Sequence, residues 1–214
     1  MLQFKNILQF SDRVRHCVLS RHEKLEDAQK NLGAAIPPIQ FESQLHGADS
    51  IIVKCEKLSK NGDALMTNKP GLPILIRTAD CASVMLFDPV KNVIANIHAG
   101  WRGTAQKIVH ATIQKMHEAF GCNARDLMAG ISPSIGSCCA VFTKPYEELP
   151  KFLHTYITEE NTFNLWAAIE GQLCECGVKN IENPRICTMC NPEDFYSYRR
   201  GDKEKRSGTA IMLV

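Results

Sequence analysis

Three short apolar runs follow one another in the first half of the chain, at residues 73–76, 83–87 and 93–97. Each is shorter than a typical buried helix, and a turn sequence rich in Asp, Pro and Asn separates the last two, at residues 88–92. Short apolar runs bounded by turn residues are typical of buried strands. The sequence therefore predicts a β-sheet core through this region.

Helical periodicity follows the third run. We expect a helix that begins after Thr104 as its N-cap and ends before Gly121, with apolar residues spaced along one face. Further expected elements are a short helix at 23–32, a Ser/Pro/Gly-rich loop at 130–139, a helix at 163–176 and a strand at 209–214. Strands and helices alternate without strict βαβ units, which predicts a mixed α/β or α+β fold. We expect a single layered domain over 1–214, with mixed β-sheets flanked by helices.

Composition excludes several classes of protein. The formal net charge is +2 and no long basic run occurs, so we expect no nucleic-acid partner. No apolar stretch approaches the roughly 18 residues of a membrane span, and the N-terminus does not resemble a signal peptide. We therefore expect a cytoplasmic protein without membrane partners, either a monomer or a small homo-oligomer. Its ten cysteines are then expected to be reduced thiols or metal ligands.

Metal-competent side chains follow the predicted strands, in loops where active sites usually form. The segments are Gln44-Leu45-His46-Gly47, Thr78-Ala79-Asp80-Cys81 and His98-Ala99-Gly100-Trp101-Arg102-Gly103. His46, Cys81 and His98 form a candidate metal triad. Two imidazoles and a thiolate favour zinc or copper over magnesium or calcium, and three protein ligands leave a fourth position for water. The alternative is that each is an ordinary packing or surface residue.

Two charged residues in these loops are candidate catalytic groups. Asp80 precedes Cys81 and is suited to orient a histidine or accept a proton, although capping of backbone amides in a turn is an equally good interpretation. Arg102 lies where a glycine-rich loop opens a helix, a position that favours an anion such as phosphate. The alternative interpretation is that Arg102 is a solvent-exposed loop residue that binds no ligand.

The other cysteines allow a second metal site. A closed four-cysteine zinc site would comprise Cys174, Cys176, Cys187 and Cys190. The spacing is not that of a standard zinc knuckle, and the first pair falls on a predicted helix. Cys138 and Cys139 are adjacent, so a disulfide between them would be strained, and they are expected to be free thiols.

The three loop segments resemble hallmark motifs of the multicopper-oxidase-like family once called polyphenol oxidase or laccase. Members of that family are also described as purine nucleoside phosphorylases and, in bacteria, as peptidoglycan editing factors. Further matching segments are 132–136 with Cys138-Cys139, Cys187-Thr188 and 195–200, so the resemblance covers about residues 44–214.

The resemblance implies a layered α/β/α fold with zinc bound by His46, Cys81 and His98. It also implies phosphate-dependent cleavage of adenosine, inosine, guanosine and methylthioadenosine, together with adenosine deamination. The partners would be purine nucleosides and phosphate. On this basis the expected catalytic residues are Asp80, Cys81 and Arg102. The expected substrate- and phosphate-binding residues are Arg21, Asn31, Gln44 and Arg102.

The chain departs from the family pattern mainly in residues 1–43, a shortened and divergent segment. After Arg21, residues 23–26 replace the expected glycines and serine, and only ten residues separate Gly33 from Gln44. Most of a helix expected there is missing. Ala140 replaces a tyrosine, and Asn164 replaces an aspartate.

Three other functions fit parts of the pattern. A copper phenol oxidase is disfavoured, because four-electron reduction of oxygen normally needs several coppers and a single His-Cys-His site holds one. Copper would nevertheless compete with zinc for such ligands. A hydrolase that edits muramyl cell-wall precursors would use the same metal site on a larger substrate. A metal-binding protein without turnover would agree with the altered segment after Arg21.

Overall fold

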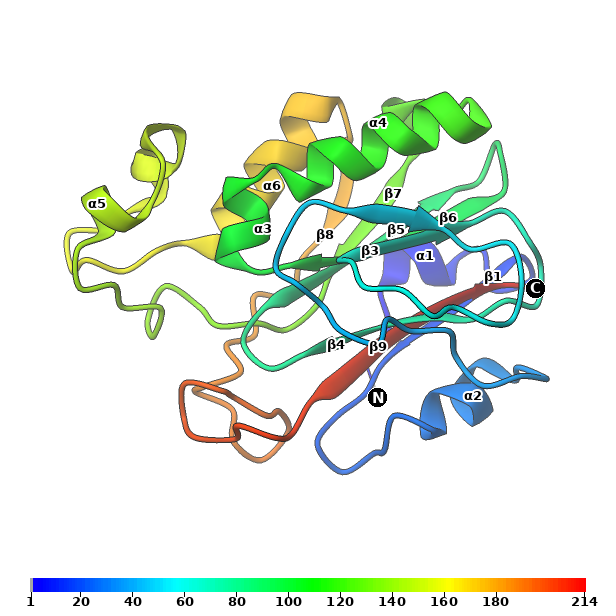
Figure 1. The fold of residues 1–214 in the computed structure, drawn as a ribbon, viewed down its shortest axis with the longest axis horizontal. Coiled ribbons are helices and arrows are strands. Elements are labelled where there is room, and N and C mark those ends of the chain that lie inside the picture. Colours follow the sequence, from blue (N-terminus) through cyan, green and yellow to red (C-terminus); the bar gives the residue numbers. More distant parts are fainter. Residues whose placement is uncertain (1) are drawn as a thin grey trace.

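The computed structural model describes residues 2–214 and contains two stacked β-sheets (Figure 1). The smaller sheet has three antiparallel strands in the order β1-β9-β4. These strands are β1 (Val14–Val18), β9 (Ser207–Leu213) and β4 (Ile74–Thr78). The last strand of the chain thus lies between two strands from its first half.

The larger sheet has six strands in the order β2-β3-β6-β5-β7-β8. Its strands are β2 (Ser50–Ile52), β3 (Ala64–Thr67), β6 (Val93–Ala99), β5 (Ala82–Asp88), β7 (Met128–Ile131) and β8 (Asn180–Glu182). The outer pairs β2–β3 and β7–β8 are parallel, whereas the inner pairs are antiparallel. The sheet is therefore mixed, as the sequence predicts.

Helices cover both outer faces of this pair of sheets (Figure 1). The long helices α4 (Ile108–Phe120) and α6 (Leu165–Cys176) pack on the six-stranded sheet, and α2 (Asp27–Leu32) packs on β1 and β9. The remaining helices are short: α1 (Lys5–Leu8), α3 (Trp101–Ala105), α5 (Pro145–Glu148), η1 (Ala124–Asp126) and η2 (Lys151–Tyr156). Within residues 2–214, no helix has the length and apolar character that crossing a bilayer requires.

The central strands β5 and β6 are buried along their whole length because both of their faces are covered. Val84 and Leu86 join the core beneath the helices, whereas Met85 and Phe87 join the core between the two sheets. This alternation follows from the two-residue repeat of a strand. Full burial of one such side chain contributes roughly 1.5–3 kcal/mol, so this strand pair is a rigid base for the loops at its ends.

The predicted elements are present, with three differences. Gly130 and Ile131 belong to β7 rather than to a loop. Thr104 does not cap the helix, because α3 already begins at Trp101 and Thr104 is buried within it. The helical path then breaks at Lys107, whose φ of 60° is left-handed, and α4 begins after it. Helix α4 ends at Gly121, as expected.

Candidate metal centre

The strand register brings the three loop segments together at one end of β5 and β6. These strands pair antiparallel with Ala82 opposite Ala99, so Cys81 and Gly100 leave the sheet side by side. His98 lies near the end of β6, and His46 comes from the loop before β2. The candidate ligand atoms of His46, Cys81 and His98 all lie within 4.8 Å of one another. This spacing suits a shared metal ion.

Gly100 makes room for the cysteine sulfur. A Cβ at this position would lie 2.6 Å from Cys81 Sγ, far inside van der Waals contact. The backbone φ of Gly100 is −76°, which any residue adopts. The glycine is therefore required by the close approach of the sulfur, and not by its own backbone conformation.

A buried carboxylate, that of Asp63, organises two of the candidate ligands. Its Oδ1 lies 2.9 Å from Nδ1 of His98 and accepts the backbone N–H of His46 at 2.8 Å. Its Oδ2 accepts the backbone N–H of Gly47 at 2.8 Å. A proton on Nδ1 of His98 leaves Nε2 as the nitrogen free to bind a metal, and such carboxylate–histidine pairs fix ligand orientation. Sequence reasoning gave this residue no role, although it lies in a segment that resembles the family and directly precedes an apolar run.

Two site residues hold an unusual backbone conformation. The φ angles of His46 and Asp80 are 59° and 83°, in the left-handed region that costs energy for residues other than glycine. The hydrogen bonds of Asp63 hold the His46 segment in place. Both residues lie in loops of the candidate site, where function commonly maintains such strain.

The electrostatics of the pocket favour the ligating form of Cys81. Burial acts to raise the pKa of this thiol. The charge of the adjacent His98 imidazole and hydrogen bonds from both histidines act in the opposite direction and together outweigh burial, so the pKa lies below its ordinary value. For His98, burial acts to lower the pKa, but the Cys81 thiolate and Asp63 raise it. The thiolate is the form of cysteine that binds metals. Two imidazoles and a thiolate therefore fit a zinc ion.

The three residues extend from the core to solvent. His98 is 3% exposed and Cys81 is half-buried, whereas His46 is exposed. The two imidazole rings meet edge to face, with their centroids 4.7 Å apart. A fourth ligand position on the His46 side would therefore be open to a water molecule or substrate.

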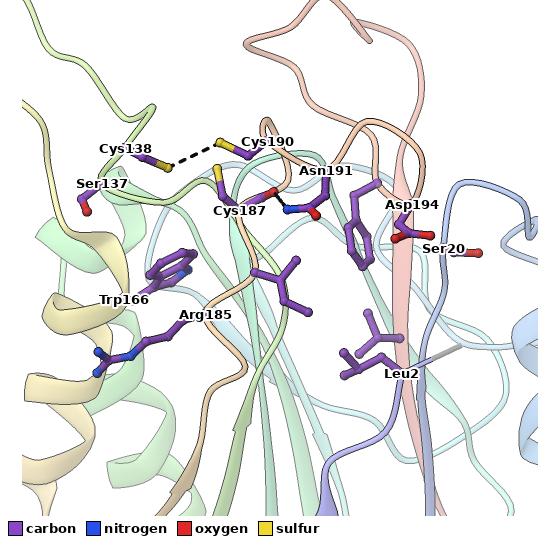
Figure 2. Close-up of a pocket in the computed structure, with 13 residues that line it drawn as sticks. Leu2, Ser20, Ser137, Cys138, Trp166, Arg185, Cys187, Cys190, Asn191 and Asp194 are labelled. Carbon is purple, nitrogen blue, oxygen red and sulfur yellow. Dashed lines mark hydrogen bonds between the residues drawn. The ribbon is translucent and has the colours of Figure 1, made fainter.

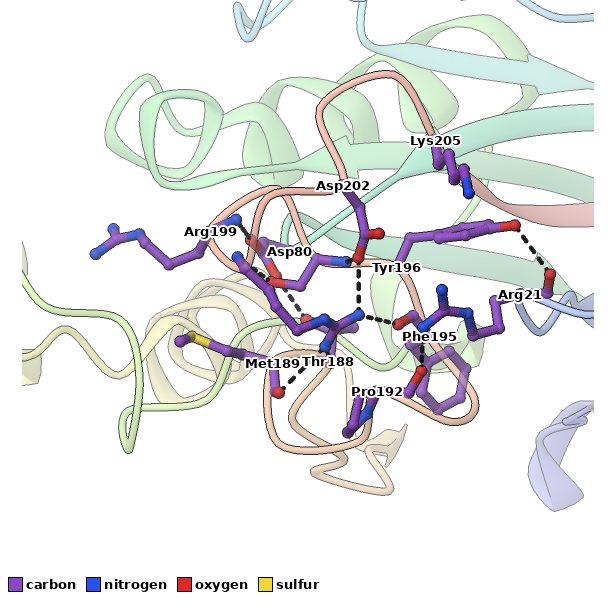
Figure 3. A network of polar contacts seen from close by, with 12 residues as sticks. Arg21, Asp80, Thr188, Met189, Pro192, Phe195, Tyr196, Arg199, Asp202 and Lys205 are labelled. Atoms are coloured by element: carbon purple, nitrogen blue, oxygen red, sulfur yellow. Dashed lines mark hydrogen bonds and ion pairs between the residues drawn. The ribbon is translucent and has the colours of Figure 1, made fainter.

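Asp80 lies beside Cys81 but contacts a different part of the chain. Its Oδ1 accepts the Thr188 hydroxyl at 2.8 Å, and its Oδ2 accepts the backbone N–H of Arg199 at 2.7 Å (Figure 3). The expectation that Asp80 orients a histidine is therefore wrong for His98, whose carboxylate partner is Asp63. Of the alternative interpretation, a turn residue that caps backbone amides, only the contact with the Arg199 amide agrees, and it comes from a distant segment instead of the local turn.

Arg102 lies in the first turn of α3, and Gln44 lies on the loop that carries His46. Arg102 is exposed, and its guanidinium stacks on the Trp101 ring at 4.2 Å from the centroid. The Gln44 amide donates to the Arg77 carbonyl at 2.8 Å and accepts the Arg77 N–H at 2.9 Å. Gln44 thus ties the loop that carries His46 to β4. Both substrate-binding roles remain predictions.

The other two expected substrate residues contact other segments. Arg21 donates to the Pro192 carbonyl and stacks on the Tyr196 ring at 5.1 Å, which joins the N-terminal segment to the loop before β9 (Figure 3). Asn31 lies on α2 and donates to Glu23 at 2.9 Å. Among the contacts described for residues 2–214, neither side chain reaches the candidate ligands.

The structure changes the membership of the predicted four-cysteine group. Cys187 and Cys190 gather with the adjacent pair Cys138 and Cys139, while Cys174 and Cys176 join no metal-competent group among the described residues. The set that the sequence allowed, but did not favour, therefore shares only Cys187 and Cys190 with the group in the structure. Helix α6 carries Cys174 and Cys176 as predicted, but the loop after β7, not α6, supplies the partners of the 187–190 segment. All ten cysteines are free thiols, as expected.

Comparison with known proteins agrees with these motifs. A family model described as multi-copper polyphenol oxidoreductase laccase matches residues 8–214. The chain belongs to this family. Residues 8–43 lie within the match, so the divergent N-terminal segment is part of the family region.

Members of this laccase family with similar sequences carry a different name. A Bacteroides thetaiotaomicron protein named purine nucleoside phosphorylase is 36% identical over 163 residues, which cover 71% of this chain and 60% of that protein. A Clostridium acetobutylicum protein with the same name is 33% identical over 175 residues, covering 78% of this chain and 73% of its own length. The match to the Bacteroides protein thus spans less than two thirds of that protein.

A solved structure confirms the fold. The hypothetical protein YfiH of Bacillus licheniformis has a TM-score of 0.78 with this chain at 26% identity. The superposition covers 88% of this chain and 79% of the Bacillus chain. The expected arrangement of mixed sheets flanked by helices is therefore correct.

Proposed function

We propose that this chain is a zinc-dependent purine nucleoside phosphorylase that also deaminates adenosine. The observation that carries the proposal is the convergence of His46, Cys81 and His98 within 4.8 Å, beside the buried Asp63. The names of the Bacteroides and Clostridium relatives support the nucleoside substrate. The nucleoside substrates are adenosine, inosine, guanosine and methylthioadenosine, and phosphate is the second substrate of phosphorolysis. The reactions take place in the cytoplasm.

The chain's own residues account for the metal preference. His46 and His98 supply imidazole nitrogen ligands, and Cys81 supplies a thiolate that the histidines stabilise. Asp63 holds the His98 ring in one orientation through Nδ1. When bound, zinc would supply Lewis-acid activation of a water molecule for attack on C6 of adenine.

Phosphorolysis needs a phosphate held against C1′ of the ribose, where positioning and charge neutralisation lower the barrier. Arg102 is the candidate for this role because it is exposed in the first turn of α3, shortly after His98. Its cationic group lies over the Trp101 ring, 4.2 Å from the centroid, and a guanidinium is suited to a bidentate contact with phosphate. Asp80, beside Cys81, is the candidate proton acceptor.

Product analysis tests the proposal. Zinc-loaded protein is incubated with adenosine, with and without phosphate, and the products are separated by chromatography. We expect adenine and ribose 1-phosphate only with phosphate, and inosine in both conditions. Both products should disappear in Cys81→Ala and persist in Cys174→Ala, a matched control on the exposed side of α6. Absence of both products from protein that holds zinc at the triad would refute the proposal.

A further inference from the structure

A second group of candidate ligands lies on two loops outside the centre described above. Cys138 and Cys139 follow β7, and Cys187 and Cys190 lie between β8 and β9. The four Sγ atoms all lie within 4.8 Å of one another. Figure 2 shows the sulfurs of Cys138, Cys187 and Cys190 turned toward one another beside a cavity of about 670 Å³.

The sulfur separations match those of a metal site. Cys190 Sγ lies 3.6 Å from Cys138 Sγ and 3.4 Å from Cys139 Sγ. Tetrahedral zinc with Zn–S bonds of about 2.3 Å places its sulfurs roughly 3.8 Å apart. A disulfide would instead need about 2.05 Å between two of the sulfurs. Both separations are slightly shorter than 3.8 Å and correspond to thiol–thiol hydrogen bonds, so the sulfurs lie close enough together to share one ion.

The surrounding backbone is built for the cluster. The Gly136 N–H lies 3.3 Å from Cys187 Sγ, and the Cys190 backbone amide also hydrogen-bonds this sulfur. A Cβ at Gly136 would lie 2.7 Å from the Trp166 ring and 3.2 Å from Cys138 Sγ. The same Cβ would lie 3.3 Å from Cys187 Cβ on the other loop, so the glycine allows its loop to approach both α6 and the Cys187 loop. Amide bonds to sulfur and a Cys-x-x-Cys spacing suit zinc-bound thiolates.

The two loops are also joined by backbone hydrogen bonds. Ser134 forms a parallel bridge with Cys187, in which Ser134 N donates to the Ile186 carbonyl and Thr188 N donates to the Ser134 carbonyl. The Trp166 indole N–H donates to the Ser134 hydroxyl at 2.7 Å. The cysteines thus project from a fixed frame, and an ion would meet its ligands already gathered.

We propose that Cys138, Cys139, Cys187 and Cys190 form a closed tetrathiolate zinc site. Four protein ligands leave no position for water, so the site is structural and not catalytic. Each thiol that coordinates the ion releases its proton to solvent. Thiolate ligands alone select zinc over magnesium or calcium.

This site would brace the loop that holds Asp80. Thr188 lies between the two ligands of the second loop, and its hydroxyl donates to Asp80 Oδ1 at 2.8 Å. Arg200 donates to the Thr188 carbonyl at 2.9 Å and so supports the same loop from the other side. A metal at the cysteines therefore fixes a contact one residue from Cys81. The site goes beyond the proposed nucleoside activity and does not depend on it.

Metal analysis tests the proposal in a Cys81→Ser background, which removes a ligand from the first centre. Zinc is counted by native mass spectrometry in this variant and with Cys190→Ser or Cys174→Ser added. We expect about one zinc per chain with Cys81→Ser alone and with Cys174→Ser added, and none with Cys190→Ser added. Equal zinc in the Cys190 and Cys174 variants, or no zinc in the Cys81→Ser protein, would overturn the site.

Alkylation of the unmutated zinc-loaded protein keeps the test independent of folding by a variant. Cys138, Cys190 and Cys174 are all exposed. We expect iodoacetamide to modify Cys174 at once, and to modify Cys138 and Cys190 only after a chelator has removed zinc. Immediate modification of all three, or a disulfide from Cys190 to either loop cysteine in protein kept under reductant, would contradict the proposal.

Discussion

Asp63 Oδ1 lies 2.9 Å from Nδ1 of His98, and both side chains are almost fully buried. Asp63 directly precedes β3 and His98 lies near the end of β6, and these neighbouring strands pair with Ala64 opposite Ile97. The pair therefore depends on the sheet register and holds the most buried candidate ligand in one orientation.

The first prediction concerns this pair. Asp63→Asn should lower zinc affinity at the triad by about 10- to 100-fold, the usual cost of losing a carboxylate behind a histidine ligand. Zinc titration against a competing chelator measures the change. Asp88→Asn is the matched control, because Asp88 is equally buried and also accepts two backbone amides, but lies at the far end of β5. Equal losses in both variants would show that Asp63 acts only on folding.

The second prediction tests the space around the cysteine. Gly100→Ala places a Cβ only 2.6 Å from Cys81 Sγ, so the sulfur must move by about 1 Å, a displacement that can lower turnover about 100-fold. Steady-state kinetics with adenosine measure the loss. Gly47→Ala is the control, since a Cβ there meets Asp63 Oδ2 at an ordinary 3.5 Å. Full activity of Gly100→Ala would mean that the position of Cys81 does not matter.

A third prediction concerns stability in acid. His16 is 1% exposed, and its Nε2 accepts the Phe4 N–H at 2.7 Å. Burial lowers its pKa from 6.5 to about 4, against an opposing effect of Glu182. Because the folded protein holds His16 neutral, its contribution is present above pH 6.5 and is lost as pH falls from 6.5 to about 4.

The loss should reach about 3 kcal/mol in the free energy of unfolding. Urea unfolding at several pH values measures it. His16→Gln, which retains an acceptor for the Phe4 amide but does not titrate, should show a flatter pH dependence. Parallel curves for the two proteins would rule out this role of His16.

The fourth prediction separates phosphate binding from metal binding. Arg102→Ala should raise KM for phosphate about 10- to 100-fold, as expected for loss of a charge-assisted hydrogen bond. Zinc content should not change, and phosphorolysis should fall more than deamination. Arg125→Ala, which removes an equally exposed arginine on η1, is the control. An unchanged KM for phosphate in Arg102→Ala would remove this residue from the phosphate site.

Local sequence patterns predict the main strands and the candidate triad because each is a short-range signal. The apolar runs of β4, β5 and β6 carry strand length and turn residues, and His46, Cys81 and His98 lie in recognisable motifs beside them. The separation of α3 from α4 is harder to predict, because it depends on a left-handed backbone conformation at Lys107 that helical periodicity does not reveal.

The supporting contacts depend on pairing between distant segments. Asp63 meets His98 across 35 residues, through the β3–β6 register. Cys187 meets the Cys138 loop through a bridge to Ser134. Helical or strand periodicity contains no information on such pairings, so the sequence suggested Asp80 for the first contact and Cys174 with Cys176 for the second. In both cases the sequence suggested the right type of residue, an aspartate or a pair of cysteines, but at the wrong position in the chain.

Adenosine turnover during addition of zinc to metal-free protein tests the central claim most directly. We predict no turnover in metal-free protein, a rise in proportion to zinc bound at His46, Cys81 and His98, and no turnover in Cys81→Ala at any zinc concentration. Turnover in Cys81→Ala equal to that of the unmutated protein, or none in protein with zinc at the triad, would contradict the assignment.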